Sequence, residues 1–271
     1  LVLFGHGLNF GGPAANGIGW LLVSFFTLLV AASMAEIASA IPTAGAVYHW
    51  AALLGGPGWG WYTAWFNFIG QLATTAGIDY GIALFVVDLM GWTGTGPLLA
   101  VYAALLLSHG LLNHYGIRAI AICNDISVWY HMAVTVALIV AFGFFAERRP
   151  LSFAFETGFT TSSYPYPWAF LVALLQSQWT LTGYDASAHI TEETLDPRHN
   201  APWGMFIAVL VSAVFGYPML LAVTCAIQDL AATAAATNPF IFVAEQAFGK
   251  GFGKAMVWAI IPAMWFCGLS S

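Results

Sequence analysis

The chain has 271 residues, of which 60% are hydrophobic, 16% are aromatic and only 7% are charged, with a formal net charge of −6. An ordinary soluble domain carries about 25% charged residues. Stretches without Asp, Glu, Lys or Arg exceed the roughly 20 residues that cross a bilayer's hydrocarbon core. They are residues 1–35, 37–78, 89–117, 126–146 and 201–227. This composition predicts a polytopic membrane protein in the lipid bilayer. It excludes a soluble enzyme, a nucleic-acid-binding protein and a secreted disulfide-rich domain.

These stretches predict an all-α fold, because a helix satisfies its own backbone hydrogen bonds inside the hydrocarbon layer. We expect one transmembrane domain over residues 1–271 that is truncated inside a span at both ends, since the sequence opens and closes in apolar runs. The predicted spans are residues 1–8 (partial), 18–40, 61–89, 97–114, 120–146, 167–189, 203–227 and 255–271 (partial). A short helix on the membrane surface is also predicted from Pro239 to Phe248.

Two of these spans, the first and the sixth, contain glycines that predict interrupted helices. The first has Gly5 and Gly7 within the segment FGHGLN, and the sixth meets two threonines, Gly183 and Asp185 after an apolar start. Unpaired amides at a helix break favour a carboxylate, and unpaired carbonyls favour a cation. Two such breaks point to a secondary transporter site. An ordinary glycine packed against a neighbouring helix is the alternative for Gly183.

Ionisable side chains inside spans are further candidates, because each is costly in hydrocarbon unless it is paired, hydrated or functional. On the fifth predicted span, His131 and Asp125 are candidate proton-coupling groups, since histidine is the side chain that changes charge nearest physiological pH. A neutral, hydrogen-bonded histidine that only packs is the alternative for His131. The other ionisable candidates are Glu36, Asp79, Asp88, Asp185 and His189.

Enzymatic chemistry has little support in this sequence. It contains no GxSxG, HExxH or phosphate-binding GxxxxGK[ST] motif. The seven histidines are scattered, and the three cysteines lie in apolar helical stretches. We therefore expect no catalytic residues, no metal site, no disulfide and no cofactor.

Two segments resemble a known family. Residues Ser33 to Gln71 resemble the second span, first intracellular loop and third span of amino acid permeases in the amino acid–polyamine–organocation (APC) superfamily. Residues Leu181 to Met205 are similar to their sixth span and following loop, where G-[FY]-[DE]-x(6)-E-E-x(4)-R-x-x-P recurs. The pattern Pro-Thr-x-Gly-x-x-Tyr at Pro42 to Tyr48 strengthens the match. The segments GLNFGGPA and AGIDYG resemble most the subgroup of γ-aminobutyrate and choline permeases.

The resemblance implies a fold of two inverted five-helix repeats, of which this chain would hold part of span 1 to part of span 8. The substrate carboxylate would meet the first span, its amine would meet carbonyls of the sixth, and amide side chains of the third would line the pocket. The implied substrate-binding residues are Gly5, His6, Gly7, Asn67, Gln71, Trp179, Thr180, Thr182 and Gly183. His131 stands where proton-coupled relatives carry a lysine.

The prediction is therefore a secondary active transporter, not an enzyme, for a small zwitterionic or cationic solute such as an amino acid, γ-aminobutyrate or a choline-like amine. We expect alternating access around the first and sixth spans, a proton as the coupling ion, and a location in the plasma membrane. An exchanger of the same substrates without ion coupling is the first alternative. A membrane-embedded enzyme and a channel are alternatives of other classes.

Overall fold

The computed structural model describes residues 1–270, apart from the side chain of residue 117, and this part of the chain is helical without a strand. The all-α prediction is confirmed. In chain order the elements are α1 (Phe4–Gly11), η1 (Ala15–Gly19), α2 (Trp20–Ala40), α3 (Ala46–Gly55), α4 (Pro57–Met90), α5 (Thr95–Tyr115), α6 (Ile117–Val140), η2 (Ala141–Phe145), η3 (Leu151–Phe155), α7 (Tyr166–Ala173), α8 (Leu175–Thr180), α9 (Ala186–His189), η4 (Thr191–Glu193), α10 (Pro197–Cys225), α11 (Leu230–Ala235) and α12 (Pro239–Leu269).

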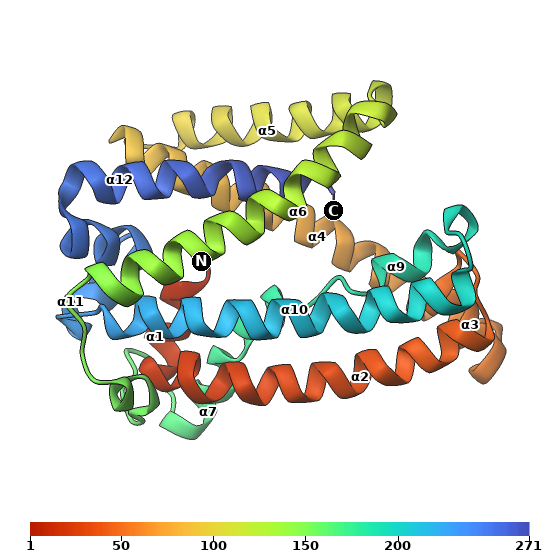
Figure 1. Ribbon diagram of the computed structural model, residues 1–271, viewed down its shortest axis with the longest axis horizontal. Helices are drawn as coiled ribbons and strands as arrows, with labels where there is room; N and C mark the ends of the chain where they lie inside the picture. The colour runs from red at the N-terminus through yellow and green to blue at the C-terminus, as the bar shows by residue number, and fades with distance from the viewer. Residues whose placement is uncertain (271) are drawn as a thin grey trace. The chain divides into compact units, whose positions relative to one another are not determined.

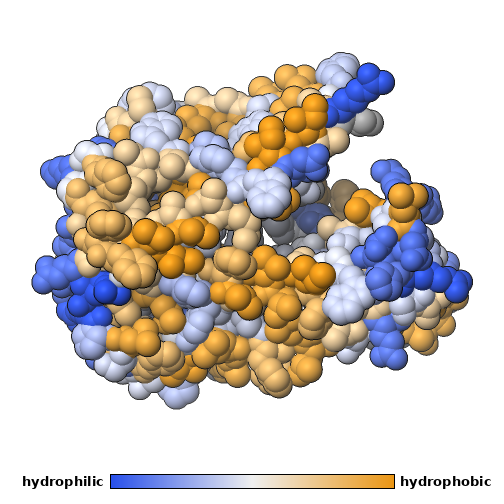
Figure 2. Space-filling model, viewed as in Figure 1, coloured by the Kyte–Doolittle hydropathy of each residue, from blue (hydrophilic) through white to orange (hydrophobic). Residues whose placement is uncertain are grey.

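Among the described residues, six helical stretches are long and apolar enough to cross a bilayer, namely residues 15–40, 57–90, 95–115, 118–145, 197–225 and 239–269. Their outward side chains are large and hydrophobic, as at Phe25 and Phe26 of α2, which are 59% and 58% exposed. Figure 2 shows hydrophobic residues over much of the surface in view. A soluble monomer rarely exposes continuous apolar surface of this extent, whereas lipid accommodates it.

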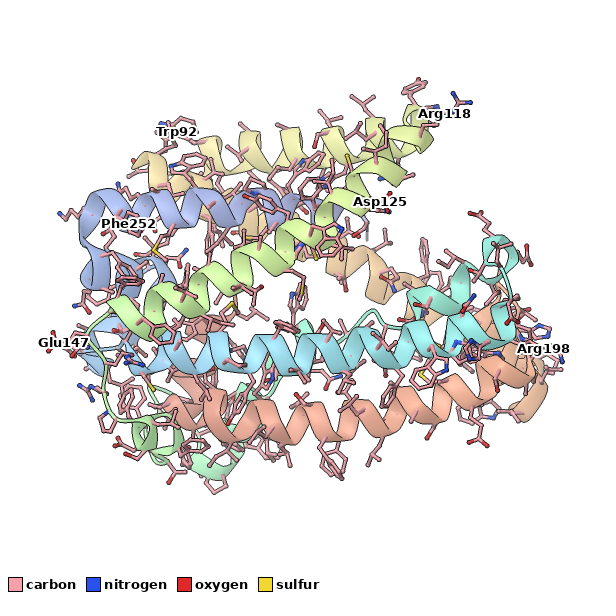
Figure 3. All side chains as sticks on the ribbon, in the orientation of Figure 1. Trp92, Arg118, Asp125, Glu147, Arg198 and Phe252 are labelled. Carbon is pink, nitrogen blue, oxygen red and sulfur yellow. The ribbon has the colours of Figure 1, made fainter. Side chains whose placement is uncertain are left out.

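Charged side chains gather near the ends of these helices, where they can reach the aqueous interface. Arg118 lies at the start of α6, Arg198 at the start of α10, and Glu147 just beyond η2 (Figure 3). The membrane-spanning interiors therefore retain few ionisable groups, and each of those few needs a physical explanation.

Two parts of the fold differ from the sequence expectation. Helix α3 occupies a stretch expected to be a loop between spans. Helix α12 contains a non-helical residue at Gly249, where φ is +79°, so its first part covers the short helix predicted from Pro239 to Phe248. A single residue, Gly56, separates α3 from α4, because α3 ends at Gly55 and α4 begins at Pro57.

The chain divides into two compact units, each assembled from separate segments. Unit 1 contains Leu1–Gly5, Ile69–Arg149 and the described residues from Ala226 onward, and unit 2 contains His6–Phe68 and Pro150–Cys225. Two of the four boundaries fall inside helices, in α1 and α4, and the other two follow Arg149 and Cys225.

Unit 2 is organised around α2 and α10, which lie side by side along their length (Figure 1). The indole nitrogen of Trp20 donates a hydrogen bond to the Ala213 carbonyl at 3.1 Å. Gly216 allows the helices to approach, because a Cβ there would lie 2.6 Å from the Trp20 ring. The Tyr217 hydroxyl donates to the Gly17 carbonyl at 3.1 Å, so α10 also holds the π-helical turn η1.

Unit 1 is built from the later part of α4 together with α5, α6 and α12. An aromatic cluster fills its interior, with the Phe240 ring 6.4 Å from Phe85 and 6.2 Å from Phe142 between centroids. The Tyr130 hydroxyl donates to the Ala259 carbonyl at 2.7 Å and joins α6 to α12. Each unit therefore has its own packed core.

Candidate substrate site at an interrupted helix

The sixth predicted span is broken in unit 2. Helices α7 and α8 carry the chain to Thr180, the next residues are not helical, and α9 begins at Ala186. At the break, Gly183 has φ +88°, a conformation that side-chain-bearing residues rarely adopt. The predicted interruption at Gly183 is confirmed, and the alternative of a glycine that only packs is wrong, since nothing lies within 4 Å of a Cβ built there.

The break leaves backbone polar groups without backbone partners. The amide of Leu181 donates to the Ser177 carbonyl at 3.1 Å, and the amide of Ala186 donates to the Gly183 carbonyl at 3.2 Å. Between them, the amides of residues 182–185 donate no backbone hydrogen bond within the described residues, and the carbonyls of residues 179–182 accept none. Amides and carbonyls freed in this way can bind opposite ends of a zwitterion.

A carboxylate also lies at the break, held in place by an amide and a histidine. Asn67 donates from Nδ2 to Asp185 Oδ2 at 3.2 Å, and His189 Nε2 lies 3.6 Å from the same oxygen. The other ring nitrogen of His189 lies 3.1 Å from the Ala44 carbonyl. The structure thus brings the predicted Asn67 to the break and adds Asp185, which the sequence marked only as one of several ionisable candidates.

The first predicted span approaches the sixth through His6 and Gly7. His6 Nε2 lies 3.1 Å from the Val172 carbonyl of α7. Gly7 touches α8, because a Cβ there would lie only 1.6 Å from Gln176 Oε1. These residues are part of a regular helix, α1, so the interruption predicted at Gly5 and Gly7 is wrong. The glycines are needed for close approach to neighbouring side chains rather than for a break, and the chain turns instead at Gly12, where φ is +64°.

A buried chain of neutral polar side chains supports this approach. Gln176 donates from Nε2 to Asn16 Oδ1 at 2.9 Å, and Asn16 donates from Nδ2 to Thr224 Oγ1 at 2.9 Å. The Thr224 hydroxyl donates to the Leu220 carbonyl at 2.7 Å. We call Gln176, Asn16 and Thr224 the amide chain; it joins α8, η1 and α10. No ionisable group marks the amide chain in the sequence; amide side chains within apolar runs are the signal that could have found it.

The remaining predicted residues of the sixth span lie around the break. Trp179 is 38% exposed, and Thr182 is exposed. Thr180 donates its hydroxyl to the Gln176 carbonyl at 3.2 Å, within its own helix. Its side chain is thereby occupied, so the backbone is the part of Thr180 that remains available at the break.

The predicted residues Gly5, Gln71, Asp125 and His131 belong to unit 1. Gly5 packs against Pro239, since a Cβ there would lie 2.8 Å from Pro239 Cγ, and Gln71 is exposed on α4. His131 Nδ1 lies 2.8 Å from the Ser127 carbonyl one turn earlier in α6. Asp125 is exposed on the same helix (Figure 3). His131 and Asp125 are not bonded to each other within the described residues.

Known sequences match this chain along nearly its whole length. The sequence profile of the family described as amino acid permease matches residues 2–271. The chain is 34% identical to the amino-acid permease BAT1 of Arabidopsis thaliana and 35% identical to its homolog in Oryza sativa subsp. japonica, with 99% of this chain covered in both. It is 27% identical to a GABA-specific permease of Saccharomyces cerevisiae over 98% of this chain. The chain spans 58%, 57% and 49% of the lengths of these relatives.

Proposed function

Because this chain belongs to the amino acid permease family of the APC superfamily, whose members are transporters and not enzymes, we propose that it carries amino acids or related small amines across a membrane by secondary active transport. The chain is an integral membrane protein, and the part that the structure describes has six helices of membrane-spanning length. We propose the plasma membrane as its location, which fractionation of cells that produce the protein will test.

The observation that carries the proposal is the break after Thr180. A zwitterion presents a carboxylate and an amine, and residues 179–185 present unpaired amides and carbonyls together with the Asp185 carboxylate. The carbonyls near Trp179, Thr180 and Thr182 would receive the amine. The substrate carboxylate would meet backbone near His6 and Gly7, and Asn67 would line the site. Gly5 and Gln71, which belong to unit 1, stay predictions from the sequence. Backbone dipoles then supply most of the recognition.

The substrate class we propose is amino acids, with γ-aminobutyrate and choline-like amines as the nearest alternatives. One relative of this chain carries the name GABA-specific permease, and two others are named amino-acid permease BAT1 or its homolog. A partly exposed indole such as that of Trp179 is compatible with a cationic head group. Choline lacks a carboxylate, so it would leave the backbone near His6 and Gly7 without that partner.

Alternating access is the mechanism we propose. The chain forms two compact units with separate cores, and both the interrupted sixth span and most of the first span belong to unit 2. Movement of one body against another around a fixed site is the usual way in which such folds alternate their openings. A proton is the proposed coupling ion, with His131 and Asp125 as the candidate groups from the sequence.

Uptake into proteoliposomes tests the proposal. The reconstituted protein should accumulate a labelled amino acid or γ-aminobutyrate when an inward proton gradient is imposed. Gly183→Val should abolish uptake, because valine cannot adopt the backbone conformation at the break without strain. Gly110→Val is the matched control, since Gly110 is an exposed helix glycine with nothing within 4 Å of its Cβ position.

The outcomes separate the alternatives. Exchange of internal for external substrate without stimulation by a proton or sodium gradient would indicate an exchanger. Flux far above transporter turnover would indicate a channel. No saturable movement of any of these solutes would refute the proposed function.

A further inference from the structure

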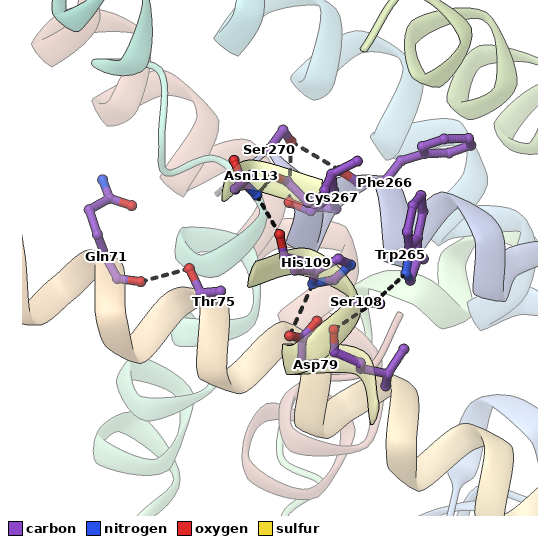
Figure 4. A network of polar contacts seen from close by, with 12 residues as sticks. Gln71, Thr75, Asp79, Ser108, His109, Asn113, Trp265, Phe266, Cys267 and Ser270 are labelled. Carbon is purple, nitrogen blue, oxygen red and sulfur yellow. Dashed lines mark hydrogen bonds and ion pairs between the residues drawn. The ribbon is translucent and has the colours of Figure 1, made fainter. Parts of the chain in front are cut away.

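A buried carboxylate and a buried histidine face each other in unit 1. Asp79 of α4 and His109 of α5 approach to 3.1 Å between Oδ2 and Nδ1 (Figure 4). The side chains are 0% and 5% exposed. Burying two ionisable groups is costly in a membrane protein unless they are paired or functional.

The pair is enclosed by the end of α12. A Cβ at Gly268 would lie 2.6 Å from Asp79 Oδ1 and 2.7 Å from His109 Cε1, so only glycine fits against both side chains. The Trp265 ring lies 5.2 Å from the His109 ring between centroids. Asn113 donates from Nδ2 to the His109 carbonyl at 3.0 Å and to the Leu269 carbonyl at 3.3 Å. Three helices thus hold the pair in one geometry.

Each member of the pair keeps one polar atom unused. Asp79 Oδ1 and His109 Nε2 are buried and have no hydrogen-bond partner among the described residues. The other titratable side chain that acts on the pair is the Cys267 thiol of α12, which interacts with Asp79. The pair therefore has no basic side chain within the described contacts to neutralise the carboxylate.

We propose that Asp79 and His109 form the proton-binding site of this protein, with His109 Nε2 as the atom that gains and loses the proton. With Nδ1–H donating to the carboxylate, neutral His109 and ionised Asp79 carry a net charge of −1. A proton that bonds to Nε2 converts the imidazole to imidazolium, and the pair becomes neutral overall. This inference rests on the proposed transport function and names the groups that couple it to protons.

A change in the net charge of the pair matters because Asp79 lies deep in the membrane-spanning part of α4. From Asp79 to the end of α4 at Met90 the helix rises about 16 Å at 1.5 Å per residue. This is about half of a 30 Å hydrocarbon core. A net charge at that depth is strongly disfavoured, whereas a neutral ion pair is tolerated. The proton-loaded and proton-free forms therefore favour different arrangements of the surrounding helices, as coupling requires.

The sequence candidates differ from this pair in their surroundings. His131 is bonded to its own helix through the Ser127 carbonyl, and Asp125 is exposed. Neither has a charged partner among its contacts within the described residues, so neither belongs to a buried ion pair there.

Two transport assays on the same proteoliposomes test the proposal. Counterflow, in which internal substrate exchanges for labelled external substrate without a gradient, measures transport itself. Accumulation driven by a gradient of one pH unit at zero membrane potential measures coupling and can reach about tenfold for one proton per substrate. Asp79→Asn should reduce the accumulation ratio to about one and retain counterflow, because asparagine fixes the neutral charge state. Asp88→Asn, an exposed aspartate on the same helix, is the matched control.

The assays separate the two proposals. Accumulation by Asp79→Asn equal to that of the unmodified protein would overturn the proton-site assignment and leave transport intact. Counterflow without proton-driven accumulation in the unmodified protein would overturn it as well. Absence of counterflow in the unmodified protein would refute the transport function itself.

Fluorescence gives a measurement independent of transport. An imidazolium close to the Trp265 ring alters the indole emission, so the unmodified protein should show a pH-dependent step. The step should disappear in His109→Gln and in Trp265→Phe and persist in His114→Gln, an exposed histidine on the same helix. A step that survives His109→Gln would contradict the assignment.

Discussion

Two buried polar clusters, one in each unit, join three helices by different chemistry. In unit 2 the amide chain of Gln176, Asn16 and Thr224 is neutral, and its hydrogen bonds run in one direction to a backbone carbonyl. In unit 1 Asp79 and His109 are both ionisable. Each has one buried polar atom without a partner in the described residues, as Gln176 has at Oε1. A neutral chain of hydrogen-bonded side chains can fix how helices pack. An ionisable pair can also change its charge and so favour a different packing of the same helices.

The largest expected effect is the loss of one member of the ionisable pair. Asp79→Leu should lower the free energy of unfolding by about 3 kcal/mol, because removing one partner leaves a buried polar ring uncompensated. The measurement is thermal unfolding in detergent. Asp79→Leu/His109→Leu should recover most of the loss, since replacing both partners by apolar side chains removes the unpaired group.

Asp88→Leu is the control for this cycle, because Asp88 is exposed on the same helix, and its effect should stay within about 0.5 kcal/mol. A loss in the double variant equal to the sum of the losses in Asp79→Leu and His109→Leu would show that the two side chains do not interact in the folded protein.

Substitution in the neutral amide chain should lower the free energy of unfolding less than Asp79→Leu does. Gln176→Leu removes the hydrogen bond to Asn16 and should reduce the free energy of unfolding by about 2 kcal/mol, as expected for a buried polar group left without its partner. The loss should be the same across the pH range of the assay, because no member of the amide chain titrates. Gln178→Leu, an exposed glutamine two residues later, should have little effect. A loss that varied with pH would contradict the distinction between the clusters.

Alanine substitution of the two glycines that contact these clusters should have the next largest effect on the free energy of unfolding. Gly7→Ala and Gly268→Ala would place a Cβ 1.6 Å from Gln176 Oε1 and 2.6 Å from Asp79 Oδ1, respectively. Each should destabilise the protein by about 1–2 kcal/mol, because the neighbouring polar side chain must move. Only the Gly268 variant should also shift the pH-dependent fluorescence step.

Gly110→Ala and Gly143→Ala are the corresponding controls, since nothing lies within 4 Å of their Cβ positions. They should be neutral or slightly stabilising, because alanine favours helix. Equal destabilisation by all four substitutions would mean that close contact at Gly7 and Gly268 is not the cause.

The sequence predicts the membrane class and the helical fold because both follow from composition and from backbone hydrogen bonding in hydrocarbon. It also predicts the break at Gly183, since glycine among threonines and aspartate contradicts a helix locally. It predicts a break at Gly5 and Gly7 for the same reason, and there it is wrong. A glycine that breaks a helix and a glycine that lets another helix approach look alike until the neighbour is known.

The pairing of Asp79 with His109 could not be predicted from spacing. The two residues are on different helices, and their contact depends on how α4 and α5 pack against Gly268 of α12. Depth in a span identifies Asp79 as a candidate, but it says nothing about its partner. The same limit applies to Asn67 and Asp185, which meet only because the chain folds α4 against the break.

The smallest expected effect on stability is at the break itself. Gly183→Ala should lower the free energy of unfolding by only about 1 kcal/mol, because the cost is the left-handed conformation and no side chain lies close to a Cβ there. Gly183→Asn should lower it less, since asparagine tolerates positive φ better than alanine. Uptake should follow the same order, with asparagine closer to the unmodified protein, and should fall further than stability does. The backbone groups of the break are therefore expected to matter for transport more than for folding. Equal uptake by both variants and the unmodified protein would place substrate recognition away from residue 183.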